Sequence, residues 1–195
     1  NITQTVANTY STKDEFNNLS IGGRNLLLAT ASSFTHNTNA KNIYALSEYI
    51  SNMSDRETVT LSFDVVATTP MYFDVYFSNT SGSTTSLADW SFMPSFQITE
   101  ANKKYHFTHT GIAKEITRFT NLRVRQNNSK NGSATHIGSL TFNNMKLELG
   151  NKATSWTKAP EDIDTSISSV SQTAEKITWL IKSGDSASNM VMTDN

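Results

Sequence analysis

The strongest constraint on the fold is strict two-residue alternation in two neighbouring segments, Thr58–Val66 and Met71–Ser78. Alternation with period two is typical of β-strands that are buried on one face. In the first segment Val59, Leu61, Phe63 and Val65 share one face. In the second, Phe73, Val75 and Phe77 share one face, and Tyr72, Asp74 and Tyr76 share the other. We therefore predict two adjacent strands, joined by a turn at Thr68–Pro70.

Further strands are predicted along the chain, at Arg24–Leu28, 43–50, Lys104–Thr110, Asn121–Gln126 and Ile137–Leu149, the last with a break near Asn143–Asn144. The Ser-, Thr- and Asn-rich stretch Thr30–Asn42 is predicted to be a loop. Strands separated by turn signals, without helical patterns between them, predict an all-β antiparallel sandwich. The first and last strands of such a fold commonly pair, so we expect residues 20 and 158 to lie close together.

A helical stalk is predicted on the C-terminal side of this β unit. Pro160, Glu161 and Asp162 suit a helix start. Apolar residues then recur with heptad spacing at Ile163, Ile167, Val170, Ala174, Ile177 and Ile181. Isoleucine at both core positions of a coiled coil favours trimers over dimers. The alternative is a single amphipathic helix that packs back on the sandwich.

Four segments follow from these patterns: an N-terminal helical stem over 1–20, the β unit over 21–159, a coiled-coil helix over 160–184 and the start of a further module over 185–195. The formal net charge of −1 argues against bulk electrostatic binding of nucleic acid. No apolar run approaches the roughly 20 residues of a membrane span. Cysteine is absent, which excludes disulfides, thiolate zinc sites and a cysteine nucleophile.

Motifs for catalysis are missing from the sequence. The histidines do not form a metal-binding pair, because His106 and His109 are three apart on one strand and should point to opposite faces. Asp64 and Asp74 could lie on one face of neighbouring strands and imitate a glycosidase pair, but solvated polar faces explain them equally well. We predict that the chain is not an enzyme and takes no cofactor.

A polar and aromatic face is the best candidate for binding chemistry. Aromatic rings stack on the apolar face of a pyranose, and planar arginine and carboxylate groups bind its hydroxyls. The alternative is that the tyrosines form ordinary cross-strand pairs and the arginines only solvate the sheet. Trp156 is expected to close the base of the sandwich. The predicted carbohydrate-binding residues are Tyr72, Asp74, Tyr76, Trp90, His106, Arg123 and Arg125.

Both ends of the β unit carry motifs with a family resemblance. Ile21–Leu27, IGGRNLL, and Met145–Asp162, MKLELGNKATSWTKAPED, resemble jelly-roll carbohydrate-binding modules in tail, baseplate and fibre proteins of phages of Gram-positive bacteria, streptococcal ones especially. Ser168–Ser188 resembles the helical connector of the same proteins. The shared motifs are structural, so no binding residues carry over from the family.

The resemblance implies a trimeric virion protein that binds host cell-wall or capsular polysaccharide outside the cell and joins other tail modules. It also makes a structural calcium ion possible, although the sequence contains no acidic cluster that would bind one. Two alternatives to a binding module remain. The β unit is then a structural spacer that thickens the tail fibre, or a polysaccharide-degrading enzyme.

Overall fold

The computed structural model describes residues 22–79, 88–89, 92 and 94–163. The chain divides into two compact units, 1–159 and 160–195, and each is considered by itself. The described residues of the second unit, 160–163, are helical. The predicted stem over 1–20, the heptad pattern beyond Ile163, the module start over 185–195 and Trp90 lie outside the described residues.

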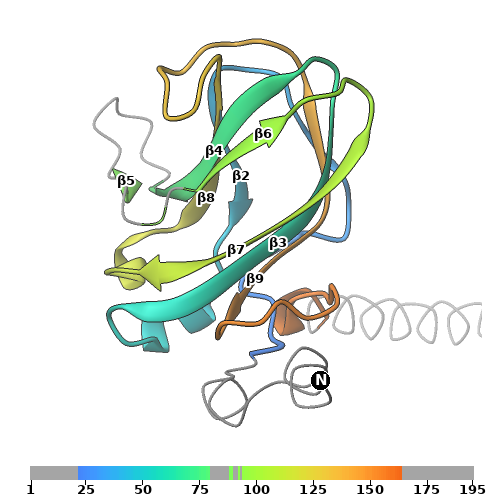
Figure 1. Ribbon diagram of the computed structural model, residues 1–195. Helices are drawn as coiled ribbons and strands as arrows, with labels where there is room; N and C mark the ends of the chain where they lie inside the picture. Colours follow the sequence, from blue (N-terminus) through green and yellow to red (C-terminus); the bar gives the residue numbers. More distant parts are fainter. Residues whose placement is uncertain (1–21, 80–87, 90–91, 93, 164–195) are drawn as a thin grey trace, which may run out of the picture. The chain divides into compact units, whose positions relative to one another are not determined.

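The first unit is built from two antiparallel sheets (Figure 1). The four-stranded sheet has the order β1-β9-β3-β7, and the five-stranded sheet has the order β2-β8-β4-β5, with β6 also paired to β4. The strands are β1 (Phe34–His36), β2 (Ala40–Ala45), β3 (Glu57–Ala67), β4 (Met71–Ser78), β5 (Ala88–Asp89), β6 (Ser95–Ile98), β7 (Lys104–Ala113), β8 (Asn121–Asn127) and β9 (Leu140–Leu149). Two short 3-10 helices are η1 (Glu48–Asn52) and η2 (Ile116–Arg118). The predicted antiparallel β-sandwich is confirmed.

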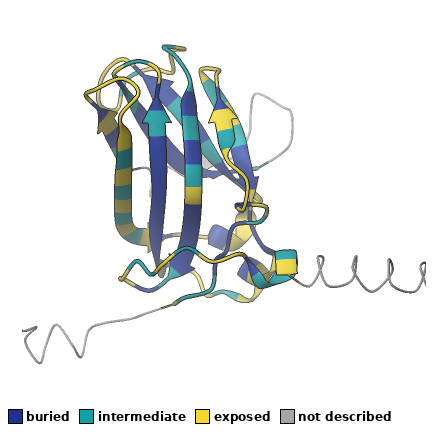
Figure 2. Ribbon diagram, turned by 90° about the vertical axis from the view of Figure 1, so that its right-hand side faces the viewer, coloured by how far each residue is buried: buried dark blue, intermediate teal, exposed yellow. Residues whose placement is uncertain are grey.

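The core lies between the two sheets and is rich in phenylalanine. Every residue predicted to face inward on β3 and β4 is fully buried. The ring of Phe63 lies 5.1 Å from that of Phe96 and 5.5 Å from that of Phe142, edge to face in both cases. Such edge-to-face pairs stabilise a core beyond simple burial. Figure 2 shows this buried interior, with exposed residues concentrated on loops and strand edges.

The last strand breaks where the sequence predicts. Asn144 has a left-handed backbone with φ of 51°, and the β3–β9 register shifts between Ser62 and Asp64. This is a β-bulge, which turns a side chain out of its regular position. Asparagine tolerates the left-handed conformation better than most residues, so the Asn143–Asn144 pair suits this position.

Two predictions near the N-terminal side are wrong. The strand expected at Arg24–Leu28 is reduced to an isolated bridge between Leu27 and Leu46. The reason is Asn25, because its side-chain oxygen accepts hydrogen bonds from the backbone N–H groups of Leu27 and Leu147 in place of a strand partner. Conversely, the predicted loop at Thr30–Asn42 contains β1 and the start of β2.

The two ends of the sandwich meet, as expected. Strand β1 pairs with β9, and the Asn25 side chain donates to the carbonyl of Thr157 at 3.0 Å. The Thr157 hydroxyl also lies 3.4 Å from the carbonyl of Gly23. Among the described residues, no helix combines the length and apolar character needed to cross a membrane.

Candidate functional site

The outer face of the five-stranded sheet gathers most of the predicted binding residues. Alternate residues of β4 and β8 point away from the core, and the antiparallel register sets them side by side. Asp74 lies opposite Arg125 on one side and Ser95 on the other. The remaining pairs on this face are Tyr76 with Arg123, and Tyr72 with both Asn127 and Gln97.

Asp74 occupies the middle of this face and is fully buried. Its Oδ2 atom accepts hydrogen bonds from Arg125 Nη2 at 2.6 Å, Arg125 Nε at 3.1 Å and Asn127 Nδ2 at 2.5 Å. Its Oδ1 atom is also buried but has no hydrogen-bond partner among the described residues. One carboxylate oxygen therefore anchors the arginine, while the other is buried without a hydrogen bond.

Two more buried oxygens on the same face lack partners in the described part of the chain. They are Ser95 Oγ, directly across the β4–β6 pair from Asp74, and Asn127 Oδ1. A buried polar atom without a partner costs roughly 1–3 kcal/mol. All three atoms are closed to solvent, so ligand hydroxyls would satisfy them only where the side chains above them move aside. The groups of this face that solvent does reach include Tyr72, Arg123 and Arg125.

Two tyrosines lie on either side of Asp74 along β4. Tyr72 is half-buried and Tyr76 is 5% exposed. Burial raises the pKa of the Tyr76 hydroxyl, and the charges of Arg123 and Arg125 act in the opposite direction. At neutral pH the phenol keeps its proton and can both donate and accept. Arg123 in turn donates to the side-chain oxygen of Asn42 on β2 at 3.3 Å.

The structure brings together five of the seven predicted site residues. His106 belongs to β7 of the other sheet, so it lies on the opposite outer face. The premise of a glycosidase pair is also wrong, because Asp64 on β3 and Asp74 on β4 belong to different sheets and point outward on opposite sides. His109 does point inward, against Phe92, so the opposed orientation of His106 and His109 is confirmed.

The sequence reasoning missed Ser95 and Asn127. Asn127 continues the two-residue spacing of Arg123 and Arg125 on β8, so that signal was present. Ser95 belongs to a strand of four residues, which is too short to show a convincing alternation.

The central carboxylate on the other outer face is fully partnered. Asp64 accepts hydrogen bonds from Lys104 Nζ, His106 Nδ1 and Asn144 Nδ2, each at 2.9 Å. Partial burial acts to raise the pKa of Asp64, but these three donors outweigh it and lower the pKa to about 2. The carboxylate is therefore ionised at all physiological pH values. The described residues hold no group of three or more His, Asp or Glu side chains that could bind a metal ion.

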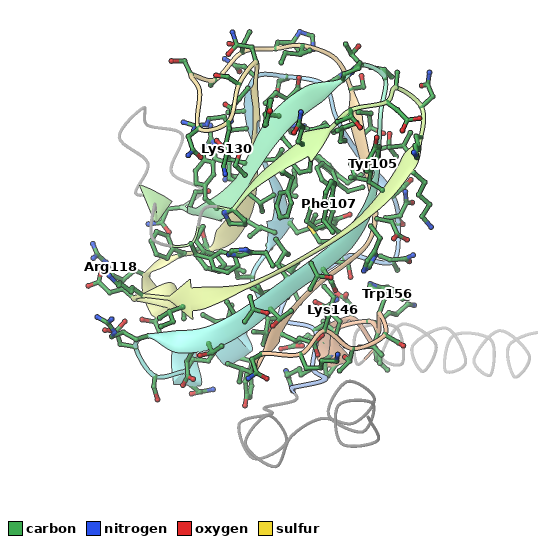
Figure 3. The ribbon with its side chains drawn as sticks, viewed as in Figure 1. Tyr105, Phe107, Arg118, Lys130, Lys146 and Trp156 are labelled. Atoms are coloured by element: carbon green, nitrogen blue, oxygen red, sulfur yellow. The ribbon has the colours of Figure 1, made fainter. Side chains whose placement is uncertain are left out.

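The two family motifs meet in a buried polar network at the end of the sandwich. Glu148 accepts from the N–H groups of Gly23 and Thr154, and Lys146 donates to the Thr154 hydroxyl and the Ser155 carbonyl. We call this cluster, together with Asn25, the terminal network. A side chain at Gly22 would lie 2.1 Å from the carbonyl oxygen of Leu149, which explains a glycine there. Figure 3 labels Lys146 on β9 and Trp156 on the following loop.

Comparisons with solved structures return distant neighbours. The tripod from the baseplate of bacteriophage Tuc2009 matches 74% of this chain at 14% identity, with a TM-score of 0.41. A family 16 carbohydrate binding module matches 62% of the chain and 82% of its own at 10% identity, with a TM-score of 0.32. The enzymatically active domain of bacteriophage CBA120 tailspike protein 4 matches 60% of the chain and 18% of its own at 14% identity, with a TM-score of 0.36.

The chain spans 61% of the tripod chain, which is less than two thirds of its length. No protein-family profile matches the sequence. No curated protein matches it either.

Proposed function

We propose that this chain is a non-catalytic carbohydrate-binding module of a phage tail protein, which recognises host cell-surface polysaccharide during adsorption. The observation that carries the proposal is the outer face around Asp74, where the solvent-accessible Tyr72, Arg123 and Arg125 lie beside three buried oxygens without partners in the described chain, on Asp74, Ser95 and Asn127. Aromatic rings beside unsatisfied acceptors and planar arginines are the groups that bind a sugar ring.

The strand order supports a jelly roll as the specific topology. The chain crosses between the sheets at every connection except those that join β4, β5 and β6: β1, β3, β7 and β9 build one sheet, and β2, β4 and β8, with β5 and β6 both paired to β4, build the other. Eight strand positions in two sheets are typical of jelly rolls, which include lectin domains. The setting in a phage tail, outside the host cell, rests on the resemblance of the IGGRNLL and MKLELGNKATSW motifs.

A non-catalytic role is supported by the separation of the two carboxylates. Asp64 and Asp74 lie on opposite outer faces, so they cannot flank one glycosidic bond, which a glycosidase pair must do.

Trimer formation through Ile163–Ile181 would place three such modules on one stalk. Weak binding at one site is then strengthened, because the later contacts become intramolecular. Sedimentation equilibrium of the intact chain measures the trimer, and a monomeric mass would contradict it.

The experiment for the binding face is a screen of host cell-wall and capsular polysaccharides, followed by calorimetry with Tyr72→Ala. We expect this change to weaken binding about tenfold, because a nucleic-acid base stacked on an aromatic side chain contributes roughly 1–3 kcal/mol and a sugar ring would stack on the same ring face. Tyr49→Ala is the matched control, since Tyr49 is an exposed tyrosine on η1. Equal affinity of both variants would reject this face. Absence of binding to any host polysaccharide would favour the spacer, and release of reducing ends would favour an enzyme.

A further inference from the structure

A hollow lies on the outer face of the four-stranded sheet, on the opposite side of the sandwich from Asp74. Its volume is about 420 Å³, which is within the usual range for small-ligand sites. The loop after β9 forms one wall, and β3, β7 and the bulge of β9 form the rest. The lining residues are Ser62, Asp64, His106, Asn144, Thr154, Ser155 and Trp156, together with Ala153.

Trp156 supplies an aromatic wall that is held in place from behind. Its indole N–H donates to Thr30 Oγ1 at 3.1 Å. The same Thr30 oxygen accepts from Asn25 Nδ2 at 3.0 Å, and Asn25 is fully buried in the terminal network. Trp156 is only partly buried and is not among the residues packed on the hydrophobic core, so the expectation that it closes the base of the sandwich is wrong. An aromatic ring that is fixed by hydrogen bonds and left open to solvent is a preorganised stacking surface.

The polar wall opposite offers donors and acceptors without a net charge. The charge of Asp64 is balanced by Lys104, which lies 2.9 Å away. In the neutral tautomer that donates its Nδ1–H to Asp64, the His106 ring presents Nε2 as an acceptor, and this atom has only a long 3.5 Å contact with Thr108 Oγ1. The β-bulge at Asn144 brings the amide of that residue beside Asp64, which leaves the amide oxygen for another donor.

From this arrangement we infer that the hollow is a second saccharide site, which takes a neutral hexose ring stacked on Trp156. The hydroxyls of a hexose match the mixed donors and acceptors of Ser62, His106 and Asn144. The apolar face of the ring matches the indole. The site is separate from the face around Asp74 and does not depend on it, because the two lie on opposite sheets.

The test is fluorine NMR of the intact chain labelled with 5-fluorotryptophan. The sequence holds three tryptophans, and a Trp156→Phe variant identifies the Trp156 resonance. Glucose, galactose and mannose are the probes, added up to roughly 100 mM, which saturates a site with a dissociation constant of about 1 mM. We expect a saturable shift of the Trp156 resonance with at least one of them. The absence of any saturable shift would overturn the inference.

Amino-acid substitutions show whether the hexose binds through several groups of the hollow or only contacts the exposed Trp156 ring. Asp64→Asn keeps the shape of the side chain but loosens the positions of Lys104, His106 and Asn144, and we expect it to weaken the hexose about fivefold or more. Thr110→Ala, on the same outer face but outside the hollow, should leave the affinity unchanged. Tyr72→Ala, on the opposite sheet, should do the same even where it abolishes polysaccharide binding. A Trp156 shift that is equally strong in Asp64→Asn would overturn the inference and leave the Asp74 face unaffected.

Discussion

Two buried polar clusters in this sandwich differ in how completely their atoms are partnered. In the terminal network, Glu148 accepts from two backbone N–H groups and a hydroxyl, and it lies 3.5 Å from Lys146 Nζ. No side-chain polar atom of Asn25, Lys146 or Glu148 is both buried and unpartnered. On the outer face around Asp74, three buried oxygens have no partner in the described chain. Complete pairing indicates a structural role, while a buried atom without a partner needs an explanation of its own, and for the Asp74 face we propose a ligand.

This difference also explains why the family motifs reveal the fold and not the ligand. The motif residues Gly22, Gly23, Asn25, Lys146 and Glu148 all serve the joining of the two ends of the sandwich. They have no capacity left for another molecule. The polar residues of the face around Asp74 lie on the central strands, outside both motifs.

The largest expected effect comes from breaking the terminal network. Glu148→Ala leaves the Lys146 ammonium, 1% exposed, without its acidic partner. Removing one partner of a buried ion pair destabilises a protein by about 3–5 kcal/mol. Urea unfolding followed by circular dichroism measures this loss. The matched control is Glu100→Ala, which removes an exposed ion pair with Lys103 and should change stability by less than about 1 kcal/mol. Similar losses in the two variants would show that the network is not structural.

A second prediction concerns His36, a buried polar group outside both clusters. Burial, and to a lesser extent the nearby charge of Lys41, lower the pKa of His36 from 6.5 to about 4. Between these values the unfolded chain binds a proton that the folded chain does not. Stability therefore falls as the pH drops from 6.5 toward 4, by an amount on the order of 2–3 kcal/mol.

Replacing the imidazole tests this dependence directly. In His36→Leu the loss of stability between about pH 7 and pH 4, measured by urea unfolding, should become much smaller. A smaller slope should persist from His109, whose pKa burial also lowers. Asp64 does not confuse the comparison, because its folded-state pKa is about 2 and its stabilising contribution is lost only below its ordinary value of 3.8. An unchanged slope in the variant would refute the assignment to His36.

The sequence predicts which residues face inward far better than it predicts which sheet a residue belongs to. Alternation along Thr58–Val66 and Met71–Ser78 separates the core face from the outer face correctly. It does not reveal that these consecutive strands enter different sheets. A sandwich has two outer faces. Alternation assigns Asp64, His106 and Asp74 to an outer face, but the first two lie on one and Asp74 lies on the other. Only the pairing of distant segments, such as β3 with β9 and β4 with β8, decides this.

The smallest expected effect is the sharpest test of the comparison between the two clusters. Ser95→Ala removes a buried hydroxyl that has no partner in the described chain, so stability should change by less than about 0.5 kcal/mol or rise slightly. Affinity for the polysaccharide should fall by about threefold to tenfold, the value of one ligand hydrogen bond. Thr60→Ala is the control, because the Thr60 hydroxyl donates to the Gly150 carbonyl, and its loss should lower stability and spare binding. Calorimetry and urea unfolding of both variants give the two readouts. If Ser95→Ala lowers stability and spares binding, its hydroxyl is structural, and unpartnered oxygens do not mark the ligand site.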